Sequence, residues 1–162
     1  MNETSRQGAS DGERNAVEIS RDYDFPRESV FNMFTDEKKA AKFWGPAGAE
    51  KLVFKFDPRP GGGITIHDRW DGRTAKTTGK VTEIVFPKLI AFTTATTPEG
   101  STVPWEALQT LRFEELGPKR TRVTVHVKVL VTGSFPGGVG PLLEGYKGGW
   151  GETFDMLQRD LR

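Results

Sequence analysis

The chain has no cysteine among its 162 residues, and this absence excludes disulfide bonds, thiolate metal sites and thiol nucleophiles. It also fits a protein of a reducing compartment. Histidine occurs only at His67 and His126, with no His-Glu-x-x-His or His-x-His pattern for a metal, and the Gly-x-Ser-x-Gly pattern of serine hydrolases is missing. The sequence therefore predicts no metal site, no cofactor and no nameable catalytic residue.

An excess of one charge and long apolar runs are lacking as well. The 23 basic and 22 acidic residues leave a net charge of +1, whereas nucleic-acid-binding surfaces are strongly basic. No stretch approaches the roughly 20 apolar residues of a membrane-spanning helix, and the N-terminus has no apolar run typical of a signal peptide. We therefore expect a cytoplasmic protein with no nucleic-acid partner and no membrane span.

Residues 1–15 are polar, rich in Ser, Gly, Asn and charged residues, and without apolar periodicity. Such a composition buries too little surface to offset the entropy lost when a chain becomes ordered. We expect a flexible tail there and one domain over residues 16–162, a length that supports a single sizeable core.

Alternation of apolar and polar residues predicts strands in the segments 16–25, 51–57, 64–70, 74–86, 88–96, 105–116 and 121–133. Two short helices are expected after the first strand, with Pro26 opening the first and Asp36 capping the second. In the second strand the alternation puts Leu52, Phe54 and Phe56 on one side.

The run "DPRPGGG" at 57–63 resembles a phosphate loop only superficially, because no Lys followed by Ser or Thr comes after it and the next residues alternate as a strand. Its prolines and glycines favour a chain reversal instead. We therefore interpret it as the turn of an antiparallel hairpin.

The apolar period changes near the C-terminus, where Tyr146, Trp150, Phe154, Leu157 and Leu161 fall on one helical stripe. A long amphipathic helix therefore closes the chain. Glycines in its first part each disfavour helix by about 1 kcal/mol relative to Ala, so we expect the helix proper to begin near Trp150. The preceding residues 136–150 are then either an ordered connection or a lid over a cavity.

This order of elements indicates an α+β domain with helices against one face of a sheet. The chain also resembles the helix-grip, START-like (SRPBCC) superfamily, in the branch named for the activator of heat-shock-protein-90 ATPase homologue. The pieces that carry the resemblance span residues 17–162 in the family's order: "FPRESVFNMFTDEKKAAKFWGP", "DPRPGGG", "GKVTEIVFPKLIAFT", "TRVTVHVKV" and "GGWGETFDMLQRDL". The resemblance implies a curved seven-stranded antiparallel sheet around the C-terminal helix, with a cavity for an apolar or amphipathic small molecule between them.

Within such a cavity, aromatic side chains supply apolar contact and a few polar groups orient the ligand. Trp44 and Trp150 are expected at the cavity mouth of a helix-grip arrangement. His67 shares a strand face with Arg69, a pair suited to a carboxylate or an enol. Core packing for the aromatics and a solvated surface for the histidine are the alternative interpretations. The candidate ligand-binding residues are Trp44, Phe54, Phe56, His67, Arg69, Trp70, Trp105, Gln109, Trp150 and Phe154.

Three functions stay open at this point, since members of one fold serve different functions. The leading hypothesis is a binding module for a small hydrophobic or amphipathic molecule. The others are a chaperone-regulating protein-interaction domain, as the family name implies, and a cyclase or hydrolase that uses polar groups of the cavity. A homodimer through a sheet edge or an aromatic patch is a further possibility.

Overall fold

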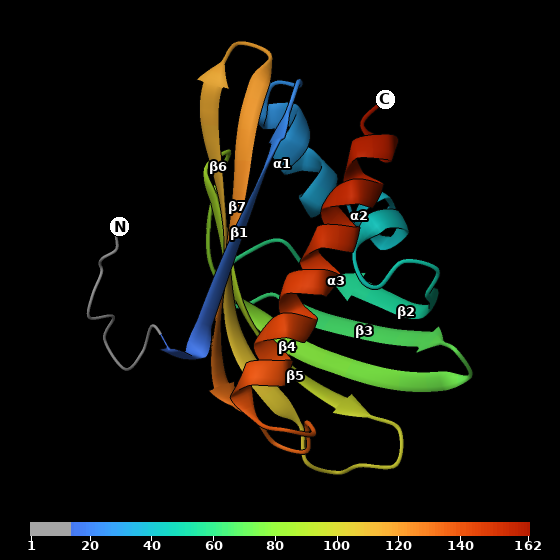
Figure 1. The fold of residues 1–162 in the computed structure, drawn as a ribbon. Coiled ribbons are helices and arrows are strands. Elements are labelled where there is room, and N and C mark those ends of the chain that lie inside the picture. The colour runs from blue at the N-terminus through green and yellow to red at the C-terminus, as the bar shows by residue number, and fades with distance from the viewer. Residues whose placement is uncertain (1–13) are drawn as a thin grey trace.

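The computed structural model describes residues 14–162, so most of the expected tail at 1–15 lies outside the described residues. The elements follow the expected order (Figure 1). In chain order they are β1 (Ala16–Tyr23), α1 (Arg27–Thr35), α2 (Glu37–Phe43), β2 (Glu50–Phe56), β3 (Gly63–Trp70), β4 (Arg73–Val85), β5 (Leu89–Pro98), β6 (Trp105–Gly117), β7 (Arg120–Val131) and α3 (Val139–Asp160).

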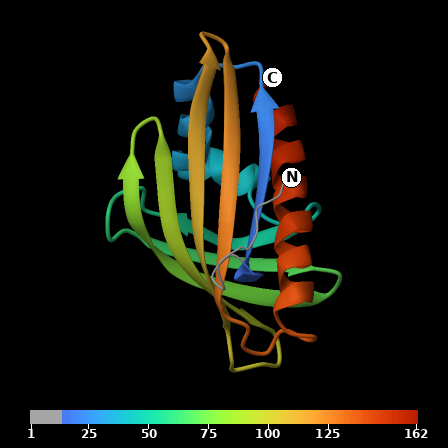
Figure 2. The same cartoon turned by 60° about the vertical axis from the view of Figure 1, so that its left-hand side comes forward.

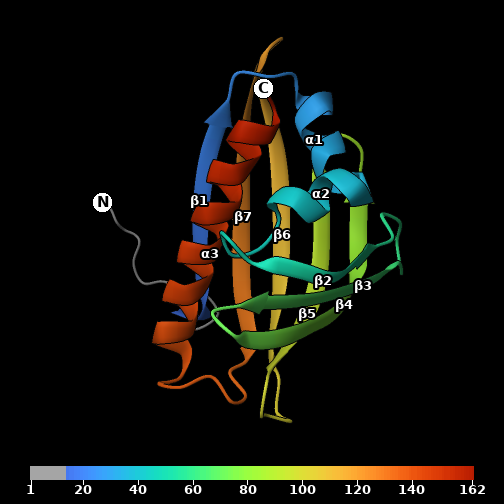
Figure 3. The ribbon, with the colours of Figure 1, turned by 90° about the vertical axis from the view of Figure 1, so that its right-hand side faces the viewer.

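The strands form one seven-stranded antiparallel sheet in the order β1-β7-β6-β5-β4-β3-β2. Strands β2 to β7 are a meander, and β1 pairs with β7 at the far edge. The sheet curves around α3, and α1 and α2 cover the same concave side (Figures 1 and 3), while Figure 2 presents the sheet from its other face. The α+β helix-grip fold predicted from the sequence is therefore confirmed.

Two local features suit the sheet to strong curvature. A Cβ at Gly79 in β4 would overlap the backbone oxygen of Thr93 in β5, so only glycine permits this close approach of the two strands. Register shifts also interrupt the pairing of β2 with β3 and of β4 with β5. Such bulges bend and twist the strand that carries the extra residue.

The bulge in β2 changes which residues face the helices. It lies between Lys51 and Val53, and it leaves Leu52 without a partner and 41% exposed. The prediction that Leu52 shares a side with Phe54 is therefore wrong, because alternation cannot anticipate an inserted residue. Lys51 takes that side instead, opposite Asp68 of β3.

The turn and cap predictions are confirmed. Residues 57–63 connect β2 to β3, and Gly61 adopts a φ of +81° that glycine tolerates without strain. The Asp36 carboxylate accepts hydrogen bonds from the backbone N–H groups of Lys38 and Lys39, each at 3.1 Å. Asp36 therefore caps α2 as its position indicates.

The predicted start of the closing helix is wrong, because α3 begins at Val139 and includes the glycine cluster. Leu142 and Trp150 are buried on the side of α3 that faces the sheet. Their packing outweighs the low helix propensity of the glycines between them, since most helical stability in proteins comes from tertiary contacts. Residues 139–150 are thus helix rather than loop.

Between the C-terminal half of α3 and the sheet, side chains fill the interior. Phe34 and Phe113 are buried with their ring centroids 5.5 Å apart, and Leu157 of α3 is fully buried. The Tyr23 hydroxyl of β1 donates to the backbone oxygen of Phe154 at 2.8 Å. We call this region the solid core; it anchors α3 to β1.

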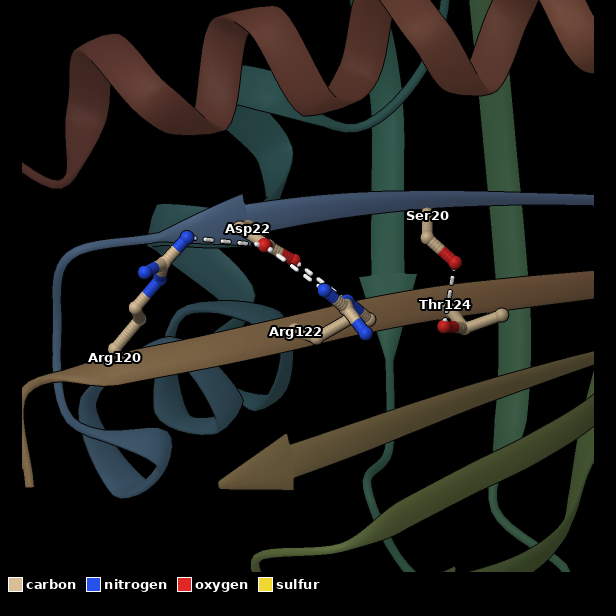
Figure 4. A network of polar contacts seen from close by, with 5 residues as sticks. All are labelled: Ser20, Asp22, Arg120, Arg122 and Thr124. Carbon is tan, nitrogen blue, oxygen red and sulfur yellow. Dashed lines mark hydrogen bonds and ion pairs between the residues drawn. The ribbon is translucent and has the colours of Figure 1, made fainter. Parts of the chain in front are cut away.

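The convex side of the same edge is polar. Asp22 of β1 accepts hydrogen bonds from Arg122 and Arg120 of β7, at 2.8 and 3.4 Å for the shortest contacts, and Ser20 bonds Thr124 at 2.7 Å (Figure 4). These residues alternate with the inward-facing ones along each strand. They hold β1 in register on β7 from the solvent side.

Candidate functional site: a pocket between α3 and the sheet

Beside the solid core, the N-terminal half of α3 and the sheet enclose a partly open pocket with a volume of about 330 Å³. The lining comes from α3, from β2 to β6 and from the two segments that precede β2 and α3. It consists of Trp44, Gly45, Pro46, Phe54, Phe56, Ile64, Ile66, Asp68, Trp70, Ala75, Thr77, Phe92, Thr94, Thr96, Trp105, Gln109, Phe135, Leu142, Gly145, Tyr146, Gly149, Trp150 and Thr153.

The sheet side of the pocket follows from strand register. Side chains of neighbouring residues across an antiparallel sheet point to the same face, so paired residues form rows. One such row crosses five strands, and all of its members line the pocket: Phe54, Ile66, Thr77, Thr96 and Trp105.

The helix side is hollow because glycines occupy it. Gly145 and Gly149, four residues apart, line the pocket next to Tyr146 and Trp150. A Cβ at Gly149 would meet no atom within 4 Å, and one at Gly145 would come no nearer than 3.8 Å to Phe135. The absence of two side chains on this face therefore leaves space that larger residues would occupy.

A directed chain of hydrogen bonds crosses the inner wall. The Trp150 indole N–H donates to Oε1 of Gln109 at 2.8 Å, and Nε2 of Gln109 donates to the Thr94 hydroxyl at 3.0 Å. Both Gln109 and Thr94 are buried. The bonds hold the amide in one orientation, because a flipped amide would set its N–H groups against the indole N–H.

Tyr146 adds a hydroxyl to this wall. Its Oη is buried and has no hydrogen-bond partner within residues 14–162. Burial raises the pKa of Tyr146 above its ordinary value, and the nearby polar groups of Thr94 and Trp105 offset part of that effect without making a well-formed hydrogen bond. The phenol is therefore a neutral donor at physiological pH.

Asp68 is the carboxylate that lines the pocket, and Lys51 accompanies it. Lys51 Nζ lies 3.2 Å from Oδ1 of Asp68, and the two side chains are 15% and 13% exposed. The contact is an ion pair without hydrogen-bond geometry, so Oδ1 counts as unsatisfied among the described residues. Burial raises the pKa of Asp68, and the charge of Lys51 partly opposes the shift.

The rim between α2 and β2 is tied to α3. The Thr153 hydroxyl accepts from the Gly45 N–H at 3.1 Å and lies 3.2 Å from the Gly45 carbonyl oxygen. Glu152 accepts from the Ala47 N–H at 2.8 Å. These bonds fix Trp44 beside Trp150, with ring centroids 5.7 Å apart.

The structure brings most of the sequence-predicted site residues to this pocket. Those that line it are Trp44, Phe54, Phe56, Trp70, Trp105, Gln109 and Trp150. Phe154 is fully buried in the solid core, where its ring contacts Tyr23 and Trp150. His67 and Arg69 alternate with the lining residues of β3 and so face the other side of the sheet, where Arg69 donates to Glu50 at 2.9 Å.

Sequence reasoning missed Asp68 and Tyr146 as pocket residues. For Asp68 a signal existed, because the residue shares the apolar face of its strand with Ile64 and Ile66 and a carboxylate on such a face is unusual. For Tyr146 the stripe on α3 indicated burial, and only the folded arrangement of the described residues leaves its hydroxyl without a partner.

Residues 14–162 hold no group of three or more His, Cys, Asp or Glu side chains arranged to bind a metal ion. None of the helices in this part of the chain is long and apolar enough to cross a membrane.

Solved structures with this architecture come from several bacteria. Protein Ms6760 from Mycobacterium smegmatis is 20% identical, with a TM-score of 0.76 and coverage of 94% of this chain and 93% of that one. The AHSA1 protein from Silicibacter pomeroyi is also 20% identical, with a TM-score of 0.75 and coverage of 90% and 96%. A protein from Arthrobacter aurescens is 21% identical, with a TM-score of 0.75 and coverage of 98% and 92%.

At these identities the structures establish the shared fold. No curated protein matches the sequence. The family model for Activator of Hsp90 ATPase homolog 1-like protein matches residues 24–161, which is nearly the whole described chain. The chain therefore belongs to the Activator of Hsp90 ATPase homolog 1-like family, within the helix-grip superfamily.

Proposed function

We propose that the protein binds a small apolar or amphipathic molecule in the pocket between α3 and the sheet. The observation that carries this proposal is a pocket of about 330 Å³ lined mostly by aromatic and aliphatic side chains. Its volume is at the lower end of the roughly 300–1,000 Å³ typical of small-molecule sites. A ligand there would contact Trp44, Phe54, Phe56, Trp70, Trp105 and Trp150, with Gln109 among the polar groups.

The glycines of α3 support a role in binding over a packing defect. In the middle of a helix each glycine costs about 1 kcal/mol relative to Ala, so filling the space with side chains would increase stability. At Gly149 a larger side chain has room, because a Cβ there meets no atom within 4 Å. A chain that keeps such glycines beside a hollow forgoes stability, as functional sites commonly do.

The test uses a pair of variants on the same turn of α3. Gly149 lines the pocket, whereas Gly148 is exposed and does not, and neither has an atom within 4 Å of its Cβ position. With N-phenyl-1-naphthylamine as a neutral fluorescent probe, we expect saturable binding to the unaltered protein. Gly149→Leu should weaken it by more than about tenfold because the side chain fills the pocket, and Gly148→Leu should change it by less than about twofold.

Equal loss of binding in the two variants would place the probe elsewhere on the protein, and no saturable binding to the unaltered protein would overturn the proposal. Native mass spectrometry of the protein purified from its own host then identifies a retained molecule and reports whether the protein is a homodimer.

The alternative function, regulation of a chaperone through protein–protein contact, is supported only by the family's description, which names an ATPase activator. Addition of the protein to a cognate chaperone of the heat-shock-protein-90 class tests it, and an unchanged ATPase turnover would remove it.

A further inference from the structure

Hydrogen-bond donors on the inner wall of the pocket remain without an acceptor among the described residues. Trp150 donates to Gln109, and Gln109 donates to the Thr94 oxygen, so both hydrogen bonds run in one direction, toward Thr94. The hydroxyl hydrogen of Thr94 is still to be donated. The Tyr146 hydroxyl, which lies beside Thr94 and Trp105, also has no acceptor within residues 14–162.

A buried hydroxyl without a partner loses the hydrogen bonds that it makes in water. The Tyr146 side chain lines the pocket, but its hydroxyl oxygen is covered in this structure, so a ligand would reach it through a small displacement of the phenol. The neighbouring Trp105 indole N–H is a donor without any acceptor capacity. This corner of the pocket therefore matches an oxygen that accepts hydrogen bonds.

The charges around the pocket indicate that this oxygen is neutral. The described lining residues include no Lys, Arg or His, and Lys51, which contacts the lining residue Asp68, is paired with that carboxylate. That pair lies at the β2–β3 side, with β4 between β3 and the strand of Thr94. A carboxylate placed against Tyr146 would lose water without gaining a cation, which is costly, whereas a carbonyl loses little.

We propose that the molecule bound in this pocket carries an uncharged hydrogen-bond acceptor, such as a ketone, ester or amide carbonyl, on an apolar body, and that the hydroxyl of Tyr146 donates to it. This inference rests on the proposed function and specifies its ligand class. The aromatic lining residues Trp44, Phe54 and Trp105 contact the apolar body, and the Thr94 hydroxyl beside Tyr146 is a second donor on the same wall.

Three probes of nearly the same shape test the proposal. In 2-acetylnaphthalene a carbonyl oxygen accepts hydrogen bonds, 2-isopropenylnaphthalene replaces that oxygen with a methylene group, and 2-naphthoate replaces the acetyl group with a carboxylate. By isothermal titration calorimetry we expect the ketone to bind the unaltered protein about tenfold more tightly than the alkene. The carboxylate should bind more weakly than the ketone.

The variant Tyr146→Phe keeps the ring and removes the donor, so it should bring the ketone's affinity close to that of the alkene. The matched control is Tyr23→Phe, because the Tyr23 hydroxyl is also buried but donates to Phe154 in the solid core, away from the pocket lining. This control should leave the ketone-to-alkene ratio unchanged.

Equal binding of ketone and alkene to the unaltered protein, or a preference that survives Tyr146→Phe, would overturn the inference while leaving the proposed function intact. Tighter binding of the carboxylate would overturn the neutral class of ligand. If none of the probes binds, and N-phenyl-1-naphthylamine does not bind either, the proposed function itself fails. If Tyr146→Phe does not fold, the ratio of ketone affinity to alkene affinity in the unaltered protein still tests the inference.

Discussion

The strand β6 passes through two different interiors, and the contrast between them explains where this fold has room for a ligand. At one end, Leu111 and Phe113 are buried, with Phe113 packed against Phe31 and Phe34 at centroid distances of 5.0 and 5.5 Å. At the other end, Trp105 and Gln109 line the pocket. One strand thus contributes to both the solid core and the hollow.

The helix α3, which faces β6 across the interior, shows the same contrast between a filled end and a hollow end. The C-terminal half of α3 presents Phe154 and Leu157, which are fully buried, and the N-terminal half presents Gly145 and Gly149. The backbone separation between helix and sheet does not have to differ for one end to be filled and the other empty, because side-chain volume alone changes the packing. The filled end of these two elements therefore contributes packing stability, and the hollow end is where we propose that the ligand binds.

The largest expected effect comes from truncating one large side chain at each end of β6. Phe113→Ala should lower the free energy of unfolding by about 3–5 kcal/mol, because it leaves a cavity among well-packed rings. Trp105→Ala should cost less than about half as much, since Trp105 borders the pocket and its ring contacts Phe135 on one side. Urea unfolding with an unchanged m-value gives both numbers.

An equal loss in the two variants would mean that the pocket end is packed as tightly as the core end, and the comparison would fail. Double substitution sharpens the result: the two sites are eight positions apart on one strand, so independent contributions should add.

Much of the fold could be predicted from the sequence. The period-2 segments and the closing helical stripe predicted the order of elements, because burial of one face imposes these patterns on any chain. Pro26 and Asp36 predicted helix starts, since they act through local geometry that neighbouring residues specify. Local rules were reliable where local physics determines the structure.

The parts that could not be predicted depend on contacts between distant residues. Because of the bulge at Leu52, the Lys51 side chain lies on the side of β2 that alternation predicted for Leu52. The alternation within one strand contains no sign of such a bulge. Helix formation through Gly149 depends on packing of Leu142 and Trp150, which propensity does not include. The charge pair of Asp68 with Lys51 and the unsatisfied hydroxyl of Tyr146 arise from the same long-range arrangement.

The two tyrosines, whose hydroxyl oxygens are both buried, give an intermediate effect that sharpens the comparison. Tyr23→Phe removes a hydrogen bond to the Phe154 oxygen in the solid core and should cost about 1–2 kcal/mol, because the carbonyl then loses its side-chain donor. Tyr146→Phe should leave stability unchanged or slightly higher, since its hydroxyl has no partner within the described residues. Thermal unfolding of the ligand-free proteins measures both, and an equal loss in the two variants would contradict the assignment of Tyr146 to the pocket.

The smallest effects concern two aspartates that should respond to pH in opposite directions. Hydrogen bonding to Arg122 lowers the pKa of Asp22 on the convex face (Figure 4), whereas burial raises the pKa of Asp68 in the pocket. For Asp22 the unfolded state binds the proton more tightly, so its contribution to stability is present above the unfolded pKa and is lost as the pH falls. For Asp68 the folded state binds the proton more tightly, so stability decreases as the pH rises from the unfolded value of 3.8 through the folded pKa.

The free energies of unfolding of the unaltered protein, Asp22→Asn and Asp68→Asn, measured from about pH 3 to pH 7, separate these contributions. The difference between the unaltered protein and Asp22→Asn should increase with pH, and the difference for Asp68→Asn should decrease. Only the slopes are compared, because Asp68→Asn also leaves Lys51 without its partner and so changes the absolute stability. Slopes of the same sign would mean that the charge of Lys51 lowers the pKa of Asp68 more than burial raises it, so that the pocket wall favours the charged carboxylate.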